Sequence, residues 1–190
     1  MTEPPPIDAW LSELGVEVVG GTGPSRGPTI SRDVIVDGER RFDLRVTIAW
    51  VEGVGCSLWA YYGLEAMEIP KRIYHRMLRA NYDYPFVKFA ITEDDRPMLL
   101  TELPERALDR DALGRSLVRL VIVADRLLEE TAGAVGDRGI LPDWSGRTPR
   151  RPELLAAYRA EVESEMPPWS PPIARRRRRG LLSRLLGNAR

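Results

Sequence analysis

The spacing of hydrophobic residues changes several times along this chain, and each change predicts a new element. Helical spacing comes first, at Ile7, Trp10, Leu11 and Leu14, and predicts a short helix over residues 7–14 that Gly15 ends. From Arg41 the spacing becomes two, with Phe42, Leu44, Val46, Ile48 and Trp50 on one side. This alternation predicts a half-buried strand with one wet face, followed after a glycine turn by a second strand over residues 56–62.

The flanking segments predict further elements of both kinds. Residues 33–36 are expected to form a strand that reaches its neighbour through a hairpin turn at Asp37–Gly38. Residues 69–82 have the pattern of a helix, whose inner stripe is Ile73, Met77 and Ala80. Residues 86–92 and 98–103 are predicted to be two more strands. The order of elements predicts an α+β fold, an antiparallel sheet of about five strands with helices packed on one face.

The longest predicted helix runs from Asp109 to about Ala134. Its main apolar stripe covers an arc of about 120° and consists of Leu113, Leu117, Leu120, Val121, Ala124, Leu127 and Leu128. Val118, Ile122 and Val123 lie outside this stripe. Two interpretations stay open for these three residues: they line a wide core, or they form a second buried surface, either a dimer interface or a partner groove.

The last third of the chain differs in composition. Residues 135–172 are rich in proline and tryptophan and are expected to form a linker with a short helix over residues 152–165. Trp144 and Trp169 lie in this linker, and we expect them to fold back onto the domain or to anchor a partner. Residues 173–190 form a basic tail, and residues 1–6 an acidic, prolyl N-terminus without the pattern of a signal peptide.

Within residues 7–134 the chain resembles the YbjN family and the related type III secretion chaperone-like fold. The residues that carry the resemblance are Trp10–Gly15, Leu44–Val46, Met77–Asn81, Phe86–Ile91 and Leu100–Pro104, followed by Leu113, Leu117, Leu120 and Ala124–Asp125. The resemblance implies a compact α+β domain that is commonly dimeric and binds segments of other proteins, without an enzymatic activity. Two departures are the turn at Glu93–Arg96, where the family usually has an Asp-Gly turn, and the extension beyond residue 134.

The formal net charge is zero, with 28 basic and 28 acidic side chains. Residues 175–190 hold seven of the basic side chains, all arginines, and no acid. Removing seven from 28 leaves 21 basic and 28 acidic side chains in residues 1–174, a net charge of −7. The chain therefore combines an acidic body with a strongly basic tail.

The tail is the strongest functional signal in the sequence. Its cations are Arg175, Arg176, Arg177, Arg178, Arg179 and Arg184, and its apolar residues are Leu181, Leu182, Leu185 and Leu186. In a helix these leucines share one face, which predicts a short basic amphipathic segment. Four interpretations stay open: binding to an anionic membrane, docking on a protein or on the acidic body, contact with nucleic-acid phosphates, which we favour less, and a solubilising end without a partner.

No set of residues predicts catalysis, a metal or a cofactor. One cysteine and one histidine exclude disulfides and zinc sites of several cysteines. Cys56 is expected to be a buried strand residue and His75 a solvated helix residue. The glycines of residues 20–27 do not have the spacing of a phosphate-binding loop. The three acids Glu93, Asp94 and Asp95 are expected to form a solvated turn.

A second group of acids, Glu102, Glu105, Asp109 and Asp111, suggests a paired-carboxylate site, although helix capping accounts for the last two. The sequence thus predicts a non-enzymatic, cytoplasmic, chaperone-like module that binds a protein client and forms a homodimer. The alternative is a peripheral adaptor at the inner face of the membrane, which binds anionic lipid through its tail.

Overall fold

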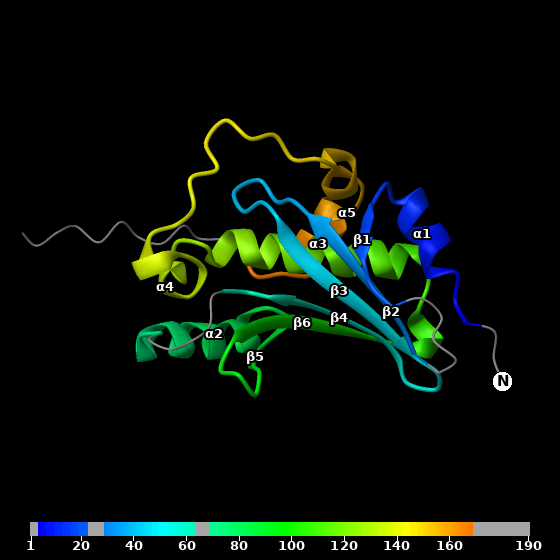
Figure 1. Cartoon of the computed structure of the whole chain (residues 1–190), viewed down its shortest axis with the longest axis horizontal. Helices are drawn as coiled ribbons and strands as arrows, with labels where there is room; N and C mark the ends of the chain where they lie inside the picture. The colour runs from blue at the N-terminus through cyan, green and yellow to red at the C-terminus, as the bar shows by residue number, and fades with distance from the viewer. Residues whose placement is uncertain (1–3, 23–28, 64–68, 169–190) are drawn as a thin grey trace, which may run out of the picture.

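The structure is a computed structural model, and it describes residues 4–22, 29–63 and 69–168. Its centre is a six-stranded antiparallel sheet in the order β1-β2-β3-β4-β6-β5. The strands are β1 (Val18–Gly20), β2 (Thr29–Val36), β3 (Leu44–Val51), β4 (Gly55–Tyr61), β5 (Lys88–Ile91) and β6 (Pro97–Pro104). Figure 1 shows helix α3 running along the sheet. The helices pack on one face, so the predicted α+β architecture is confirmed.

The helices are α1 (Ile7–Glu13), α2 (Lys71–Asp83), α3 (Arg110–Leu127), the single turn α4 (Ala132–Val135) and α5 (Pro152–Ser164). Two short 3₁₀ turns, η1 (Glu105–Ala107) and η2 (Asp137–Gly139), complete the elements. No helix in the described ranges is long and apolar enough to cross a membrane.

Strand β3 shows how the sequence pattern becomes a two-faced sheet. Leu44, Val46, Ile48 and Trp50 are at most 3% exposed and face the helices. The residues between them are half-buried or exposed, as the alternation predicts. The predicted strand begins too early, because Asp43 has a φ of +57° and belongs to the loop before β3.

Other elements also differ from the prediction. Strand β2 begins at Thr29 rather than at residue 33. The expected Asp37–Gly38 turn is a longer loop, in which Gly38 N–H donates to Arg41 O at 2.7 Å. Strand β1 was not predicted, because three residues are too few to show alternation. The long helix ends at Leu127 rather than near Ala134. In the turn after this helix, the buried Thr131 hydroxyl donates to Leu127 O at 2.6 Å and lies 2.8 Å from the Tyr62 hydroxyl. These contacts hold the turn between α3 and α4.

Helix α2 covers the outer edge of the sheet at β5. The side-chain amide of Asn81 accepts from Phe89 N–H at 2.6 Å and donates to Phe89 O at 3.1 Å. Asn81 therefore pairs with β5 as a neighbouring strand would. An edge strand with free backbone groups is a template for aggregation, and this side chain blocks part of that edge.

Candidate protein-binding surface

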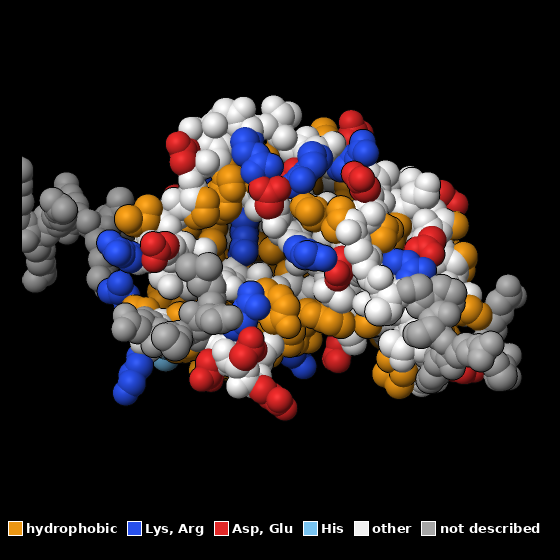
Figure 2. Space-filling view, in the orientation of Figure 1, with side chains coloured by type: hydrophobic (Ala, Val, Ile, Leu, Met, Phe, Trp, Pro, Cys, Tyr) orange, Lys and Arg blue, Asp and Glu red, His pale blue; other side chains and the backbone are white. Residues whose placement is uncertain are grey.

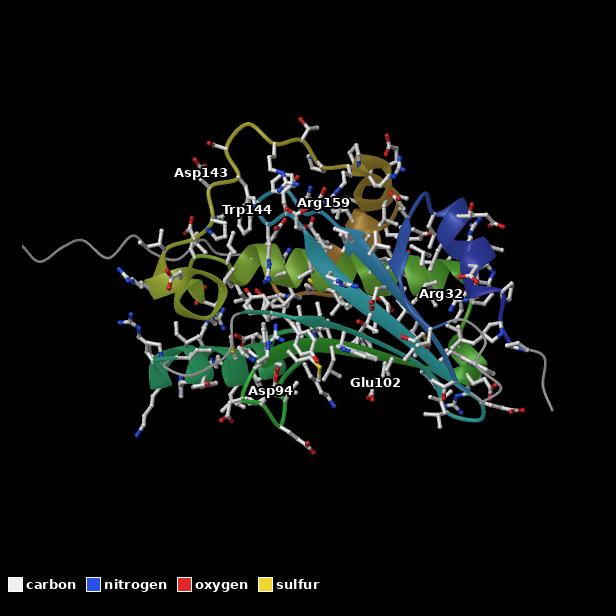
Figure 3. The ribbon with its side chains drawn as sticks, viewed as in Figure 1. Arg32, Asp94, Glu102, Asp143, Trp144 and Arg159 are labelled. Carbon is white, nitrogen blue, oxygen red and sulfur yellow. The ribbon has the colours of Figure 1, made fainter. Side chains whose placement is uncertain are left out.

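Three of the residues considered for catalysis, Cys56, Asp109 and Asp111, have structural roles. Cys56 is 2% exposed on β4, and burial raises the pKa of its thiol to about 12, so it is a poor nucleophile. Asp109 caps α3, where its carboxylate accepts from Ala112 N–H at 2.6 Å. Asp111 accepts from the Tyr158 hydroxyl at 2.8 Å. In Figure 3, Asp94 at the β5–β6 turn lies apart from Glu102 on β6.

No group of acidic, cysteine and histidine side chains in the described part of the chain has the arrangement of a metal site. The acids of the β5–β6 turn, Glu93, Asp94 and Asp95, are exposed. The turn itself is closed by Thr92 N–H, which donates to Arg96 O at 3.0 Å, and the Thr92 hydroxyl donates to the Asp94 carboxylate. This arrangement fits the expected solvated turn.

The three residues proposed for an interface lie inside this chain. Val118 and Val123 are 0% exposed and Ile122 is 5% exposed. Helix α5 packs along α3, and its Leu154, Leu155 and Val162 belong to the same apolar cluster. Val118, Ile122 and Val123 are all buried by other parts of this chain, so a dimer or partner interface through them would require part of the fold to move away. The helix assigned by sequence to a linker is thus part of the core.

Polar contacts flank the apolar contact between α3 and α5. Arg119 donates to the Glu165 carboxylate, Arg126 pairs with Glu163 at 3.3 Å, and Arg115 with Glu161 at 3.5 Å; all three arginines are on α3. Gly114 permits the close approach of α5, because a Cβ at this position would lie 2.5 Å from Cε2 of Tyr158. The packing of α5 thus depends on α3 side chains along most of its length.

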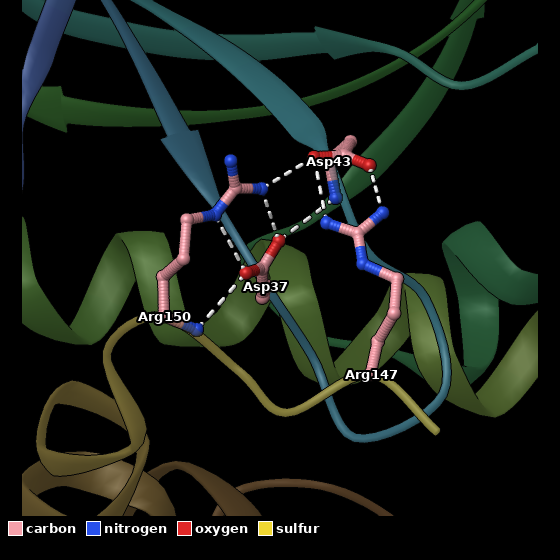
Figure 4. Close-up of polar contacts among 4 residues, drawn as sticks. All are labelled: Asp37, Asp43, Arg147 and Arg150. Atoms are coloured by element: carbon pink, nitrogen blue, oxygen red, sulfur yellow. Dashed lines mark hydrogen bonds and ion pairs between the residues drawn. The ribbon is translucent and has the colours of Figure 1, made fainter. Parts of the chain in front are cut away.

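A cluster of four charged residues holds the segment that leads into α5 (Figure 4). The fully buried Asp37 carboxylate accepts from Nε and Nη2 of Arg150 at 2.8 and 2.6 Å. It also accepts from the backbone N–H groups of Arg150 at 3.0 Å and Asp43 at 2.8 Å. Asp43 in turn pairs with both Arg147 and Arg150. We call these four residues the strap clamp.

Burial alone would raise the pKa of the Asp37 carboxyl. The hydrogen bonds from Arg150 and from the two backbone N–H groups outweigh burial and leave this pKa lowered. Close by, Trp144 folds back as expected: its ring lies 6.4 Å from that of Phe42, and Figure 3 shows it beside the loop between β2 and β3. Trp169 lies outside the described residues.

The outer side of α2 and the residues just beyond it carry three exposed large apolar side chains, among them Tyr82, the most exposed large apolar side chain of the described residues. Leu78 is 67% exposed and Tyr82 is 85% exposed, one helical turn apart. Phe86, just beyond the helix, is also 67% exposed. We call Leu78, Tyr82 and Phe86 the α2 patch. The sequence contained its signal in a second i, i+4 stripe, Tyr74–Leu78–Tyr82, which the prediction of the inner stripe did not include.

Phe86 is exposed but held in place. Its φ is +63°, a conformation rare for an aromatic residue, and the Arg119 guanidinium lies 5.1 Å from its ring centroid. Arg119 is only 7% exposed and also pairs with Glu165. A buried arginine that also contacts the end of α5 therefore holds the Phe86 ring in its exposed position.

Charged side chains project from the end of the molecule where α2 lies (Figure 2). Lys71, Arg72, His75 and Arg79 are all exposed on this helix. The predicted functional residues of the tail, Arg175–Arg179, Arg184 and the four leucines of residues 181–186, lie outside the described residues. Among the surfaces that the structure describes, the α2 patch is thus the candidate protein-binding surface.

Comparisons with known proteins give a likeness in structure. No family model matches the chain, and no curated protein matches it. The chain is similar to a solved structure of the heterodimeric complex ExoU–SpcU from the type III secretion system of Pseudomonas aeruginosa. The sequence identity is 24%, the match covers 67% of this chain and 97% of that chain, and the TM-score is 0.43. The resemblance to the YbjN family stays a prediction.

Proposed function

We propose that this protein is a non-enzymatic, chaperone-like module that binds a protein client in the cytoplasm through the α2 patch. The exposure of Leu78, Tyr82 and Phe86 carries the proposal. Single exposed apolar residues are ordinary, but a cluster of large ones marks a site of interaction. Aromatic residues are also enriched where protein interfaces are most tightly packed.

A site-specific photo-crosslinker tests this proposal in the native cell. Placed at Tyr82, it should give a discrete crosslinked protein, whereas at Ile140, an exposed apolar residue elsewhere with 71% of its surface in solvent, it should give none. The captured protein, once identified and purified, should bind the wild-type chain and lose that binding to Leu78→Ser/Tyr82→Ser. Equal binding to both would refute the assignment of this surface.

Homodimerisation is a further part of the proposal and needs its own measurement. Light scattering of the purified chain should give twice the chain mass of 21.5 kDa. A Val118→Glu/Ile122→Glu variant is unsuited to this question, because both positions are buried and two carboxylates there would disrupt the core in a monomer as well. A folded, strictly monomeric wild type would end this part of the proposal.

A second candidate function is that of a peripheral membrane adaptor. It rests on the seven arginines of residues 175–190 and the leucines between them. Each arginine near an anionic surface would contribute about 1 kcal/mol. Sedimentation with anionic and neutral vesicles, with and without residues 173–190, tests it, and equal recovery of both chains would reject it. The same pair of chains, titrated with a labelled oligonucleotide, tests the nucleic-acid alternative.

A further inference from the structure

The outer face of α2 is cationic as well as apolar. Lys71, Arg72 and Arg79 are exposed, and Arg79 has 65% of its side chain in solvent. Leu78 and Tyr82 lie close to Lys71 on the helical wheel, while Arg72 and Arg79, seven residues apart, share a flank about a quarter turn away. The α2 patch therefore has a row of arginines along one side.

The single acid of α2 does not neutralise this face. Asp83 pairs with Arg76 at 3.2 Å and, more loosely, with Arg79 at 3.6 Å. Arg76 points toward the turn after α3, where it pairs with Glu130. In the described part of the chain, neither Lys71 nor Arg72 has an ion-pair partner. The outer face of α2 is thus cationic, although residues 1–174 together carry a net charge of −7.

This charge argues against two occupants that the chain itself offers. A second copy packed α2 against α2 would bring Lys71, Arg72 and Arg79 of both copies together, and like charges oppose such an interface. The C-terminal tail brings seven more arginines and no acid. A second copy and the C-terminal tail would each have to bury their apolar side chains against electrostatic repulsion. A partner of opposite charge is therefore favoured.

We propose that α2 binds an acidic amphipathic helix of a partner protein. Its apolar side would lie along Tyr74, Leu78 and Tyr82, which span about 12 Å at a rise of 1.5 Å per residue. Its acidic side would meet Arg72 and Arg79. This geometry fits side-by-side packing of two helices over about two turns. The inference rests on the proposed function and adds the chemical class of the partner.

Fluorescence anisotropy with two synthetic amphipathic peptides tests the inference on the full-length chain. Both peptides share one leucine face, and their polar faces carry either glutamate or lysine. The glutamate peptide should bind at least about tenfold more tightly. Raising KCl from about 50 to about 500 mM should remove most of this preference, because salt screens exposed charges. Equal binding of the two peptides at low salt would overturn the inference.

Three variants locate the effect. Arg72→Glu/Arg79→Glu should reverse the peptide preference, and Leu78→Ser/Tyr82→Ser should abolish binding of both peptides. Arg106→Glu/Ile140→Ser, which changes an exposed arginine and an exposed apolar residue elsewhere, should leave the preference unchanged. Circular dichroism confirms that each variant is folded. An unchanged preference in Arg72→Glu/Arg79→Glu would overturn the inference.

Two further outcomes separate this inference from the proposed function. If Tyr82 still crosslinks to a client whose binding does not change in Arg72→Glu/Arg79→Glu, the proposed function stands and the acidic-helix inference fails. If vesicles containing about 30% phosphatidylserine bind through these arginines and the glutamate peptide does not compete, the surface recognises lipid, which also overturns the inference.

Discussion

Removing the Asp37 carboxylate should release the segment before α5 from the rest of the fold. In wild type this buried carboxylate accepts two hydrogen bonds from the Arg150 guanidinium and two from backbone N–H groups. The Asp37→Ala variant leaves all four donors without this acceptor. Two of these donors, the backbone N–H groups of Asp43 and Arg150, make part-buried hydrogen bonds.

The magnitude follows from the burial of each partner. Removing one partner of a fully buried ion pair lowers the free energy of unfolding by about 3–5 kcal/mol. Arg150 is 45% exposed, so solvent replaces part of its lost partner and the lower end applies, about 3 kcal/mol. For a chain of 190 residues this corresponds to a fall in Tm of about 6–12 °C. Asp37→Asn, which keeps one acceptor oxygen, should lose about half as much.

Urea unfolding followed by circular dichroism measures these differences, and its pH dependence tests their cause. Since the pKa of Asp37 is lowered in the folded state, its stabilisation is complete above the ordinary value of 3.8 and is lost as the pH falls through the lowered folded pKa. The stability difference between wild type and Asp37→Asn should therefore be largest near neutral pH and shrink below pH 3.8.

An exposed acid supplies the matched control. Asp137→Asn, at a surface position of the same C-terminal region, should change stability by less than about 0.5 kcal/mol. The double variant Asp37→Asn/Arg150→Gln should cost less than the sum of its single variants, because the two residues share hydrogen bonds. Additive effects, or a loss of stability in Asp37→Ala no larger than in the control, would refute the clamp.

Three further predictions concern packing. In Asn81→Ala, the Phe89 amide should exchange hydrogen faster by NMR and the edge of β5 should self-associate in light scattering, since the backbone groups of Phe89 lose their partner. The Cys56 thiol should stay unreactive to a disulfide reagent up to pH 9 and react only on unfolding, because burial raises its pKa to about 12. Gly114→Ala should raise the free energy of unfolding of a Tyr158→Ala variant by about 1 kcal/mol, because alanine has the higher helix propensity. In wild type the same change should give no gain, because the new Cβ meets the Tyr158 ring. Urea unfolding measures both effects, and equal effects in the two backgrounds would contradict this packing.

Local pattern was enough to predict most of the elements. The alternation at Leu44, Val46, Ile48 and Trp50 depends only on neighbouring residues, and the structure buries all four. The inner stripe of α2 was found in the same way. Boundaries were less accurate where a single backbone conformation decides them, as at Asp43, because its positive φ has no signature in hydrophobic spacing.

The candidate surface was only partly accessible to the same reasoning. Val118 and Ile122 were recognised as apolar beyond the main stripe of α3, but spacing does not say what covers such residues. The cover is α5, more than thirty residues later in the chain. Conversely, Leu78 and Tyr82 were visible as a stripe, but only the packing of α2 at the sheet edge shows that they remain in solvent.

The sequence alone determined the α+β class, the long apolar helix, and the division into an acidic body and a basic tail, since these follow from composition and local periodicity. The tertiary structure decided that the C-terminal helix belongs to the core, that Asp37 binds Arg150 across 113 residues of chain, and that α2 exposes its second stripe. The physical reason is that burial depends on contacts between distant segments, and no local pattern specifies which of two apolar faces another element will cover.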